Sequence, residues 1–214
     1  LIDFVRPFSL AKSRLFMSAT LADDSSLVRE LGCDKNTAIN PIVPASDKGL
    51  GERMVLAPSL IHESLDRDAV MSICQKFSRE CNVVVLCHNK KMARDWESVG
   101  ATIYMEEIDE GIEALRNPAS GVTFAVFVQR YDGVDLADNA ARILVVDGMP
   151  YGESVTDKLD SVLIDEPGGA RKKIIYRIEQ GLGRAVRSHV DFACVLLVGA
   201  DIANFVAKRD VIES

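Results

Sequence analysis

The sequence predicts an open α/β fold, in which a mostly parallel sheet carries helices on both faces. Short apolar runs rich in Val, Ile and Leu, at residues 83–87, 122–128 and 193–198, show no alternation with polar residues. Such runs are typical of strands buried on both faces. Segments with helical spacing lie between them, as strand-helix-strand units require.

The first sixty residues predict two different regions. Residues 15–17 indicate a short buried strand, and Asp23 or Asp24 is expected to cap a helix that ends at Leu31 before Gly32. Residues 33–60 contain three prolines, the turn-forming 49–51 segment and weak periodicity, which is the composition of a linker.

The rest of the chain alternates between helix and strand patterns. In order, we expect helix 61–81, strand 83–87, helix 91–99, strand 101–105, helix 108–116, strands 122–128 and 142–146, helix 171–187, strand 193–198 and a helix from residue 203. Ligands of such folds lie beyond the carboxyl ends of the strands. The loops after Met17, Cys87, Val128, Val146 and Val198 are therefore the places to search for a site.

Composition restricts the class of protein. The 214 residues are 48% hydrophobic and 27% charged, which is ordinary for a globular protein, and the apolar runs are too short to span a membrane. Five cysteines, an odd number without a C-x-x-C pair, predict reduced core thiols in a cytoplasmic protein and no metal site. Because the chain begins at Leu1 inside a hydrophobic segment, we expect a piece of a longer protein.

The charge is distributed unevenly. A net charge of −7 argues against a stand-alone nucleic-acid binder. Residues 101–169 hold fourteen acidic and four basic residues, whereas residues 171–190 hold six Lys or Arg and one Glu. The basic segment is therefore the part expected to meet an anion, and the role of the acidic 151–169 stretch is left open.

The basic segment contains the most informative pattern, Gln180-Gly181-Leu182-Gly183-Arg184-Ala185-Val186-Arg187. On a helix, Gln180, Arg184 and Arg187 would share one face. Two guanidinium groups on one face can bind several phosphate oxygens, although two arginines alone are more typical of a solvated basic surface. The glycines weaken a helix and indicate that something approaches the backbone closely.

Three further segments accompany this pattern. A predicted strand is followed by Asp132-Gly133-Val134-Asp135, which by itself is an ordinary turn composition. Ser18-Ala19-Thr20 follows the predicted strand 15–17, and a strand followed by a hydroxyl-rich turn is the alternative interpretation. His88 and Asn89 follow the strand 83–87, and for His88 a solvated or capping role is the simpler interpretation.

Taken together and in this order, these segments resemble motifs III, IV, V and VI of superfamily 2 helicases of the DEAD/DEAH-box type. The resemblance implies that residues 1–32 end a first motor domain, that 33–60 form a linker and that 61–214 form a second, RecA-like motor domain. Asn89 stands where relatives often carry Ser or Thr, which weakens the match at motif IV.

The resemblance also implies roles for individual residues. Arg184 and Arg187 would act on the ATP phosphates, one of them as an arginine finger, and Gln180 would sense the γ-phosphate or the attacking water. Gly133 would let backbone amides approach a phosphate and Asp135 would accept hydrogen bonds from ribose hydroxyls. The implied ATP-binding residues are Gly133, Asp135 and Gly183, and the residues implied to couple nucleotide state to nucleic acid are Ser18, Thr20 and Asn89.

The implied function is an ATP-dependent helicase or translocase that uses ATP with Mg²⁺. The sequence has no phosphate-binding G-x-x-x-x-G-K-[ST] loop, so the metal ligands and most of the ATP site are expected in a missing N-terminal motor domain, and this fragment alone is expected to be inactive. The glutamine that opens motif VI, where the RNA-directed branch usually has His, favours DNA over RNA. The alternatives are a self-contained nucleotide-binding domain and a non-catalytic interaction module of RecA-like fold; we expect no membrane association.

Overall fold

The computed structural model of the chain describes residues 5–17, 25–29, 31–40, 42, 51–129, 135–136, 138–150, 169–183, 185–186 and 191–208. Two compact units, Leu1–Lys48 and Gly49–Ser214, make up the chain and are described separately. In the part of the chain that the structure describes, no helix is long and apolar enough to cross a membrane.

The first unit contains three short helices in its described residues. They are α1 (Arg6–Ser9), α2 (Ser25–Arg29) and α3 (Lys35–Ile39). The Asp34 carboxylate caps α3 by accepting hydrogen bonds from the Thr37 amide at 3.0 Å and the Thr37 hydroxyl at 3.2 Å. α2 ends at Arg29, before the predicted Leu31, and Gly32 follows it with φ +63°, the conformation in which glycine ends helices. The predicted caps, Asp23 and Asp24, lie outside the described residues.

The predicted strand at residues 15–17 is not formed. These residues have no regular structure, and the side chains of Leu15 and Met17 are 82% and 83% exposed. A strand needs a neighbouring strand to satisfy its backbone groups, and the described residues of this unit provide none. The prediction of a short buried strand was therefore wrong for this unit, because an apolar run reports hydrophobicity rather than the presence of a partner.

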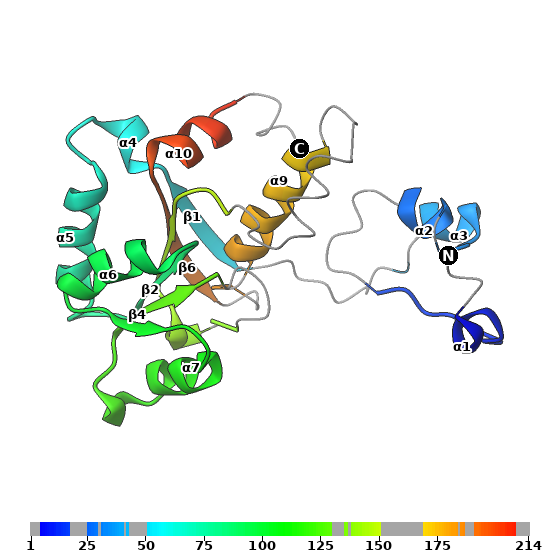
Figure 1. Ribbon diagram of the computed structural model, residues 1–214, viewed down its shortest axis with the longest axis horizontal. Coiled ribbons are helices and arrows are strands. Elements are labelled where there is room, and N and C mark those ends of the chain that lie inside the picture. The colour runs from blue at the N-terminus through cyan, green and yellow to red at the C-terminus, as the bar shows by residue number, and fades with distance from the viewer. Residues whose placement is uncertain are drawn as a thin grey trace. The chain divides into compact units, whose positions relative to one another are not determined.

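The second unit is built on one six-stranded, all-parallel sheet with the order β1-β6-β5-β2-β4-β3 (Figure 1). Its strands are β1 (Glu52–Leu56), β2 (Val83–Cys87), β3 (Thr102–Tyr104), β4 (Phe124–Val128), β5 (Ile143–Asp147) and β6 (Phe192–Val198). Its α-helices are α4 (Pro58–Ile61), α5 (Arg67–Phe77), α6 (Lys90–Ser98), α7 (Ile108–Arg116), α9 (Gly169–Leu182) and α10 (Ala200–Val206), and the 3₁₀ helices are η2 (Pro118–Ser120) and η3 (Asp138–Ala140).

Helices cover both faces of the sheet, as the absence of alternation in the strands predicts. On one face α5 and α6 pack over Val83, Val85 and Cys87 of β2, and Trp96 of α6 is fully buried there. On the other face α7, α9 and α10 pack over the alternate strand residues. The expected α/β fold with a RecA-like parallel sheet is confirmed.

Local signals fix where several of these helices begin and end. Asp66 accepts a hydrogen bond from the Ala69 amide at 2.9 Å and starts α5, and Asn89 accepts one from the Met92 amide at 2.9 Å and starts α6. Gly100, with φ +100°, follows the end of α6. The predicted helix 108–116 and the predicted strand 83–87 match α7 and β2 residue by residue.

The sheet extends into the segment that the sequence predicts to be a linker. Within residues 33–60, β1 pairs with β6 from Glu52 opposite Phe192 to Leu56 opposite Leu196, and α4 begins at Pro58. β1 is an edge strand whose side chains are mostly exposed, so the hydrogen bonds of its backbone hold it rather than a hydrophobic pattern. The linker prediction was therefore wrong for these residues.

The helix that carries the Gln180 pattern is shorter than predicted. α9 ends at Leu182, Gly183 lies in a turn, and Ala185 and Val186 are not helical. The predicted helix 171–187 therefore does not continue through Ala185 and Val186, and Arg184 and Arg187 lie outside the described residues. Gly181 and Gly183, which each weaken a helix by about 1 kcal/mol, explain the early end.

Candidate functional site

The sheet has a topological switch point between β2 and β5. The chain leaves β2 through α6 toward β3 on one side, whereas it leaves β5 toward β6 on the other side. Loops that diverge in this way open a crevice at the carboxyl ends of the strands, where α/β proteins bind ligands. We call this side of the sheet the carboxyl edge and the opposite side the amino edge.

Asn89, one of the predicted coupling residues, lies at the carboxyl edge. Its side-chain oxygen caps α6, and its amide nitrogen lies 2.9 Å from Nε2 of His88. Both polar atoms of the Asn89 side chain are thus engaged within the protein. Any effect of Asn89 on a ligand would be exerted through the position of α6 rather than through a free amide.

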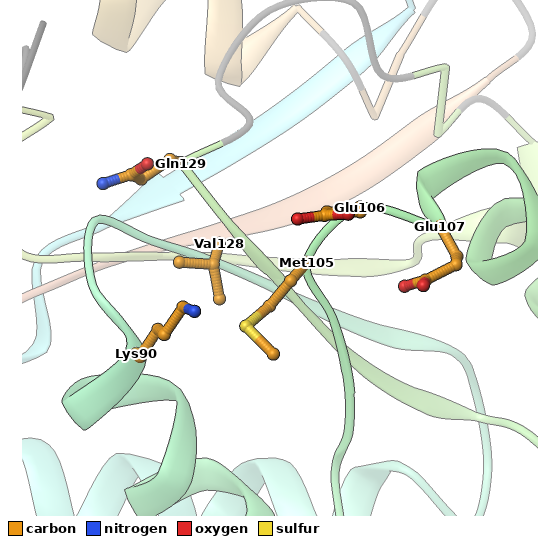
Figure 2. Close-up of a pocket in the computed structure, with 6 residues that line it drawn as sticks. All are labelled: Lys90, Met105, Glu106, Glu107, Val128 and Gln129. Atoms are coloured by element: carbon orange, nitrogen blue, oxygen red, sulfur yellow. The ribbon is translucent and has the colours of Figure 1, made fainter.

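Next to Asn89, a pocket of about 460 Å³ opens at the carboxyl ends of β2, β3 and β4 (Figure 2). Its lining residues are Lys90, Met105, Glu106, Glu107, Val128 and Gln129. Figure 2 shows the side chain of Lys90 pointing toward Val128 and Met105, with the two carboxylates on the side of the pocket that leads to α7. The pocket therefore presents one cation, an apolar floor and two anions.

Gln129 enters this pocket with a strained backbone. Its φ is +58°, and its amide donates a hydrogen bond of 2.8 Å to the carbonyl of Cys87 across the ends of β4 and β2. Non-glycine residues in the left-handed region cost on the order of 1–3 kcal/mol and gather at functional sites. The strain marks the loop after β4, which is the loop in which the sequence predicts Gly133 and Asp135.

A buried charge cluster that the sequence did not predict also lies at the carboxyl edge. Arg67 donates to both carboxylate oxygens of Asp147, at 2.8 to 3.1 Å, and to Asp95 at 2.8 Å. The Trp96 indole donates to Asp147 Oδ2 at 2.6 Å. The side chain of Asp147 is only 1% exposed. We call these four residues the Arg67 cluster; it joins the start of α5, the middle of α6 and the end of β5.

The charges in the Arg67 cluster compensate one another. Burial alone would lower the pKa of Arg67, but the hydrogen bonds and charges of Asp147 and Asp95 outweigh burial and hold that pKa above its ordinary value. Close by, burial raises the pKa of the Cys87 thiol to about 12, and the charge of Asp147 adds to this effect. The arginine and the two carboxylates of the cluster are thus paired with one another, and the raised pKa of Cys87 makes it an unreactive thiol.

The segment that follows Asp147 is held from two sides. Gly148 has φ +79°, and its amide donates to the Val198 carbonyl at 2.8 Å. A Cβ at Gly148 would lie 3.3 Å from Met92 and 3.4 Å from His88, so α6 and the end of β2 pack directly on this backbone. At the end of the segment, the Pro150 carbonyl accepts a hydrogen bond of 3.4 Å from Arg177 of α9.

Asp135 lies at the amino edge, away from Asn89. Its carboxylate is 3.3 Å from the guanidinium of Arg116, the last residue of α7, and its carbonyl accepts a hydrogen bond from the same guanidinium. The amide of Asn82, just before β2, donates to the carbonyls of Leu115 and Asn139 at 2.7 Å each, which places the end of α7 and η3 beside the amino end of β2. The structure therefore separates Asp135 from Asn89 by the length of a strand.

A second buried ion pair lies at the same amino edge. Arg142 Nη1 is 2.7 Å from Asp191 Oδ1, and the Asp191 side chain is 1% exposed. Asp191 also accepts hydrogen bonds from the backbone amides of Asp138 and Phe192. This pair fixes the connections into β5 and β6.

Gln180 is exposed in the last turn of α9, and Gly183 forms the turn that follows. α9 runs antiparallel to β6, so it ends toward the amino edge (Figure 1). Gln180, Gly183 and Asp135 thus lie toward one edge, and Asn89 lies at the other. The remaining predicted site residues, Ser18, Thr20, Gly133, Arg184 and Arg187, lie outside the described residues.

Comparison with known proteins decides the family. A family model described as the helicase C-terminal domain matches residues 67–212. The chain belongs to the helicase C-terminal domain family. The match begins at Arg67, the residue at the centre of the buried cluster, and it spans strands β2 to β6, the pocket and the Gln180 pattern.

Solved structures resemble the fold of this helicase C-terminal domain. A structure described as an XPD helicase matches with a TM-score of 0.52 and 17% sequence identity over 77% of this chain and 34% of its own length. A structure described as apo XPD matches with a TM-score of 0.50 and 18% identity over 77% of this chain and 39% of its own. The chain therefore spans between a third and two fifths of the length of these structures. A comparison with curated protein sequences found no match.

Sequence reasoning did not find the Arg67 cluster, and only one signal could have pointed to it. Asp147 ends an otherwise apolar central strand, and a carboxylate in that position needs a buried partner. The partner lies 80 residues earlier in the chain, and nothing in the sequence around Arg67 distinguishes it from other surface arginines.

Proposed function

We propose that this chain is the second motor domain of an ATP-dependent nucleic-acid helicase or translocase, with DNA preferred over RNA. The observation that carries the proposal is the family match over residues 67–212, which includes the Gln180-to-Arg187 pattern. ATP with Mg²⁺ would be held mainly by an N-terminal motor domain, and Arg184 and Arg187 would complete the site on closure. Bound ATP supplies the phosphoryl group whose developing charge these arginines would stabilise.

The separation of the candidate residues into two edges supports this arrangement. Gln180, Gly183 and Asp135 lie toward the amino edge, where this domain would meet an ATP bound to another domain. Asn89 and Lys90 lie at the carboxyl edge, where an anionic strand could reach the Lys90 pocket. A domain that contacts ATP at one edge and a nucleic-acid strand at the other can change conformation when either ligand binds, which a motor requires.

The Lys90 pocket fits a nucleic-acid strand on one side only. Lys90 supplies a cation for a phosphate, whereas Glu106 and Glu107 repel phosphates on the side toward α7. Met105, 42% exposed, offers an apolar surface against which a base can pack. This distribution of charge would bind a strand in a single path across the ends of β2 and β4.

The experiment that tests the proposal is the ATPase rate of the full-length protein with and without single-stranded DNA or RNA. We expect stimulation by nucleic acid, stronger with DNA. Arg187→Ala should lower the stimulated rate by about 10³-fold or more, because it removes charge stabilisation in the transition state. Lys173→Ala removes a positive charge from the same basic segment and serves as the control, with a rate close to that of the unmodified protein.

Absence of stimulation, or an Arg187→Ala variant as active as the unmodified protein, would contradict the motor function. In that case a non-catalytic module of the same fold would be the better description. Translocation along labelled single strands distinguishes a translocase from a nucleic-acid-dependent ATPase that does not move.

A further inference from the structure

A continuous series of contacts runs from the carboxyl edge to α9 through the Arg67 cluster. Asn89 caps the first turn of α6 at the Met92 amide, and Arg67 donates to the Met92 carbonyl at 3.3 Å. Arg67 then binds Asp147 with two nitrogens. Beyond Asp147, the chain reaches Pro150, whose carbonyl accepts from Arg177 of α9.

The geometry of this series restricts movement at each step. Asp147 Oδ2 accepts from two nitrogens of Arg67 and from the Trp96 indole, so the carboxylate cannot rotate without breaking several charge-assisted bonds. Gly148 is packed against Met92 and bonded to Val198. A displacement of the first turn of α6 therefore moves the Asp147-to-Pro150 segment with it.

The two ends of the series coincide with the two proposed ligand sites. One end is the turn that contains Asn89 and Lys90, which lines the pocket at the carboxyl edge. The other end is α9, whose last turn carries Gln180 and leads to Arg184. A buried ion pair is not required to stabilise a core, since apolar residues often do so as well. In this domain the Arg67–Asp147 pair would instead link the position of α6 to that of the Asp147-to-Pro150 segment.

We propose that Arg67 and Asp147 are positioning residues that couple occupancy of the nucleic-acid site to the ATPase site within this domain. This inference rests on the proposed function and names the residues that carry its regulation. Neither residue touches ATP or the strand. They act by holding the Asp147-to-Pro150 segment between α6 and α9.

The test is the ratio of ATPase kcat with and without saturating single-stranded DNA, measured on the full-length protein. Arg67→Met removes the linkage, and we expect the ratio to fall about 5-fold or more. Val70→Ala is the matched control: it lies one turn further along α5, is 2% exposed and loses core packing while leaving the ion pair intact. Val70→Ala should lower the thermal stability but keep the ratio.

Arg67→Lys is a second variant that keeps the test possible if Arg67→Met does not fold. It keeps the charge beside Asp147 but cannot bind in the bidentate manner, so an intermediate ratio is expected. An unchanged ratio in both Arg67 variants, or an equal fall in Val70→Ala, would overturn the coupling role while the unmodified protein still showed stimulation. If the unmodified protein showed no stimulation, the proposed function itself would fail, and this inference with it.

Discussion

The two ends of β5 carry buried ion pairs of similar composition but different construction. At the carboxyl end Asp147 pairs with Arg67, and at the amino end Arg142 pairs with Asp191; both carboxylate side chains are 1% exposed. Asp191 also accepts hydrogen bonds from two backbone amides, whereas Asp147 also accepts one from the side chain of Trp96. The amino-end pair is thus anchored by backbone amides at the starts of η3 and β6, and the carboxyl-end pair depends on side chains from two helices.

The difference between the two pairs indicates which end of β5 is held rigidly and which end can move with the helices. The two amides that donate to Asp191 belong to Phe192, the next residue, and to Asp138 of η3, and neither depends on the Arg142 side chain. The side chains around Asp147 keep their place only while α5 and α6 remain packed against β5. A pair of the second kind transmits helix displacement, and a pair of the first kind resists it.

The largest expected effect comes from removing each arginine in turn. Arg67→Met leaves the Asp147 charge buried with one remaining indole donor, and we expect a loss of about 3–5 kcal/mol in the free energy of unfolding. Arg142→Met should cost less, because two amides still donate to Asp191. Urea denaturation of both variants measures the difference. Equal losses would mean that the anchoring of the two carboxylates does not differ in energy.

The same contrast between local and distant contacts explains what the sequence could predict. α7 was predicted residue by residue because its stop signal, Asn117-Pro118, adjoins its last residue. β2 and β4 were found because apolar residues fill them completely. These signals lie within the element that they define or directly next to it.

Features that depend on distant partners were missed. β1 was read as linker because its hydrogen bonds go to β6, about 140 residues later, and its own side chains are exposed. The strand at 15–17 was predicted from hydrophobicity where no neighbouring strand is described. The Arg67–Asp147 pair spans 80 residues, so the sequence suggested candidate site residues only within motifs and gave no sign of this pair.

A smaller effect is expected at the glycine that follows Asp147. Gly148 and Gly121 have nearly the same φ, +79° and +72°, but a Cβ at Gly148 would lie 3.3 Å from Met92, whereas nothing lies within 4 Å at Gly121. Gly121→Ala should cost only the backbone strain, about 1 kcal/mol. Gly148→Ala should cost more, about 2 kcal/mol, because Met92 and His88 must also shift.

Thermal or urea unfolding of these two variants tests whether the segment after Asp147 is packed as tightly as the ion pair implies. If Gly148→Ala were no more destabilising than Gly121→Ala, α6 would yield to the added methyl group. The mechanical linkage between α6 and the Asp147-to-Pro150 segment would then be weaker than its contacts indicate.

The smallest expected effect uses two cysteines as reporters on the α5 and α6 face of the sheet. Burial raises the pKa of Cys74 and of Cys87 to about 12, but Asp147 contributes only to Cys87. At pH 8 a thiol with a pKa of about 12 is ionised in about one molecule in 10⁴, so both should react slowly with iodoacetamide. Because the folded-state pKa is raised, the stability that the neutral thiols contribute is present below about pH 9 and is lost as the pH rises toward 12.

Asp147→Asn separates the two thiols. It removes the negative charge beside Cys87, so the pKa of Cys87 should fall and its rate of alkylation should rise a few-fold, while the rate at Cys74 stays unchanged. Mass spectrometry of peptides labelled at several pH values measures both rates in one sample. A rise at both cysteines would show that the substitution loosens the whole α5 and α6 face, in which case the Arg67 cluster holds that face together as a unit. A rise at Cys87 alone would show that the charge of Asp147 acts locally on this thiol while the α5 and α6 face stays packed around Cys74.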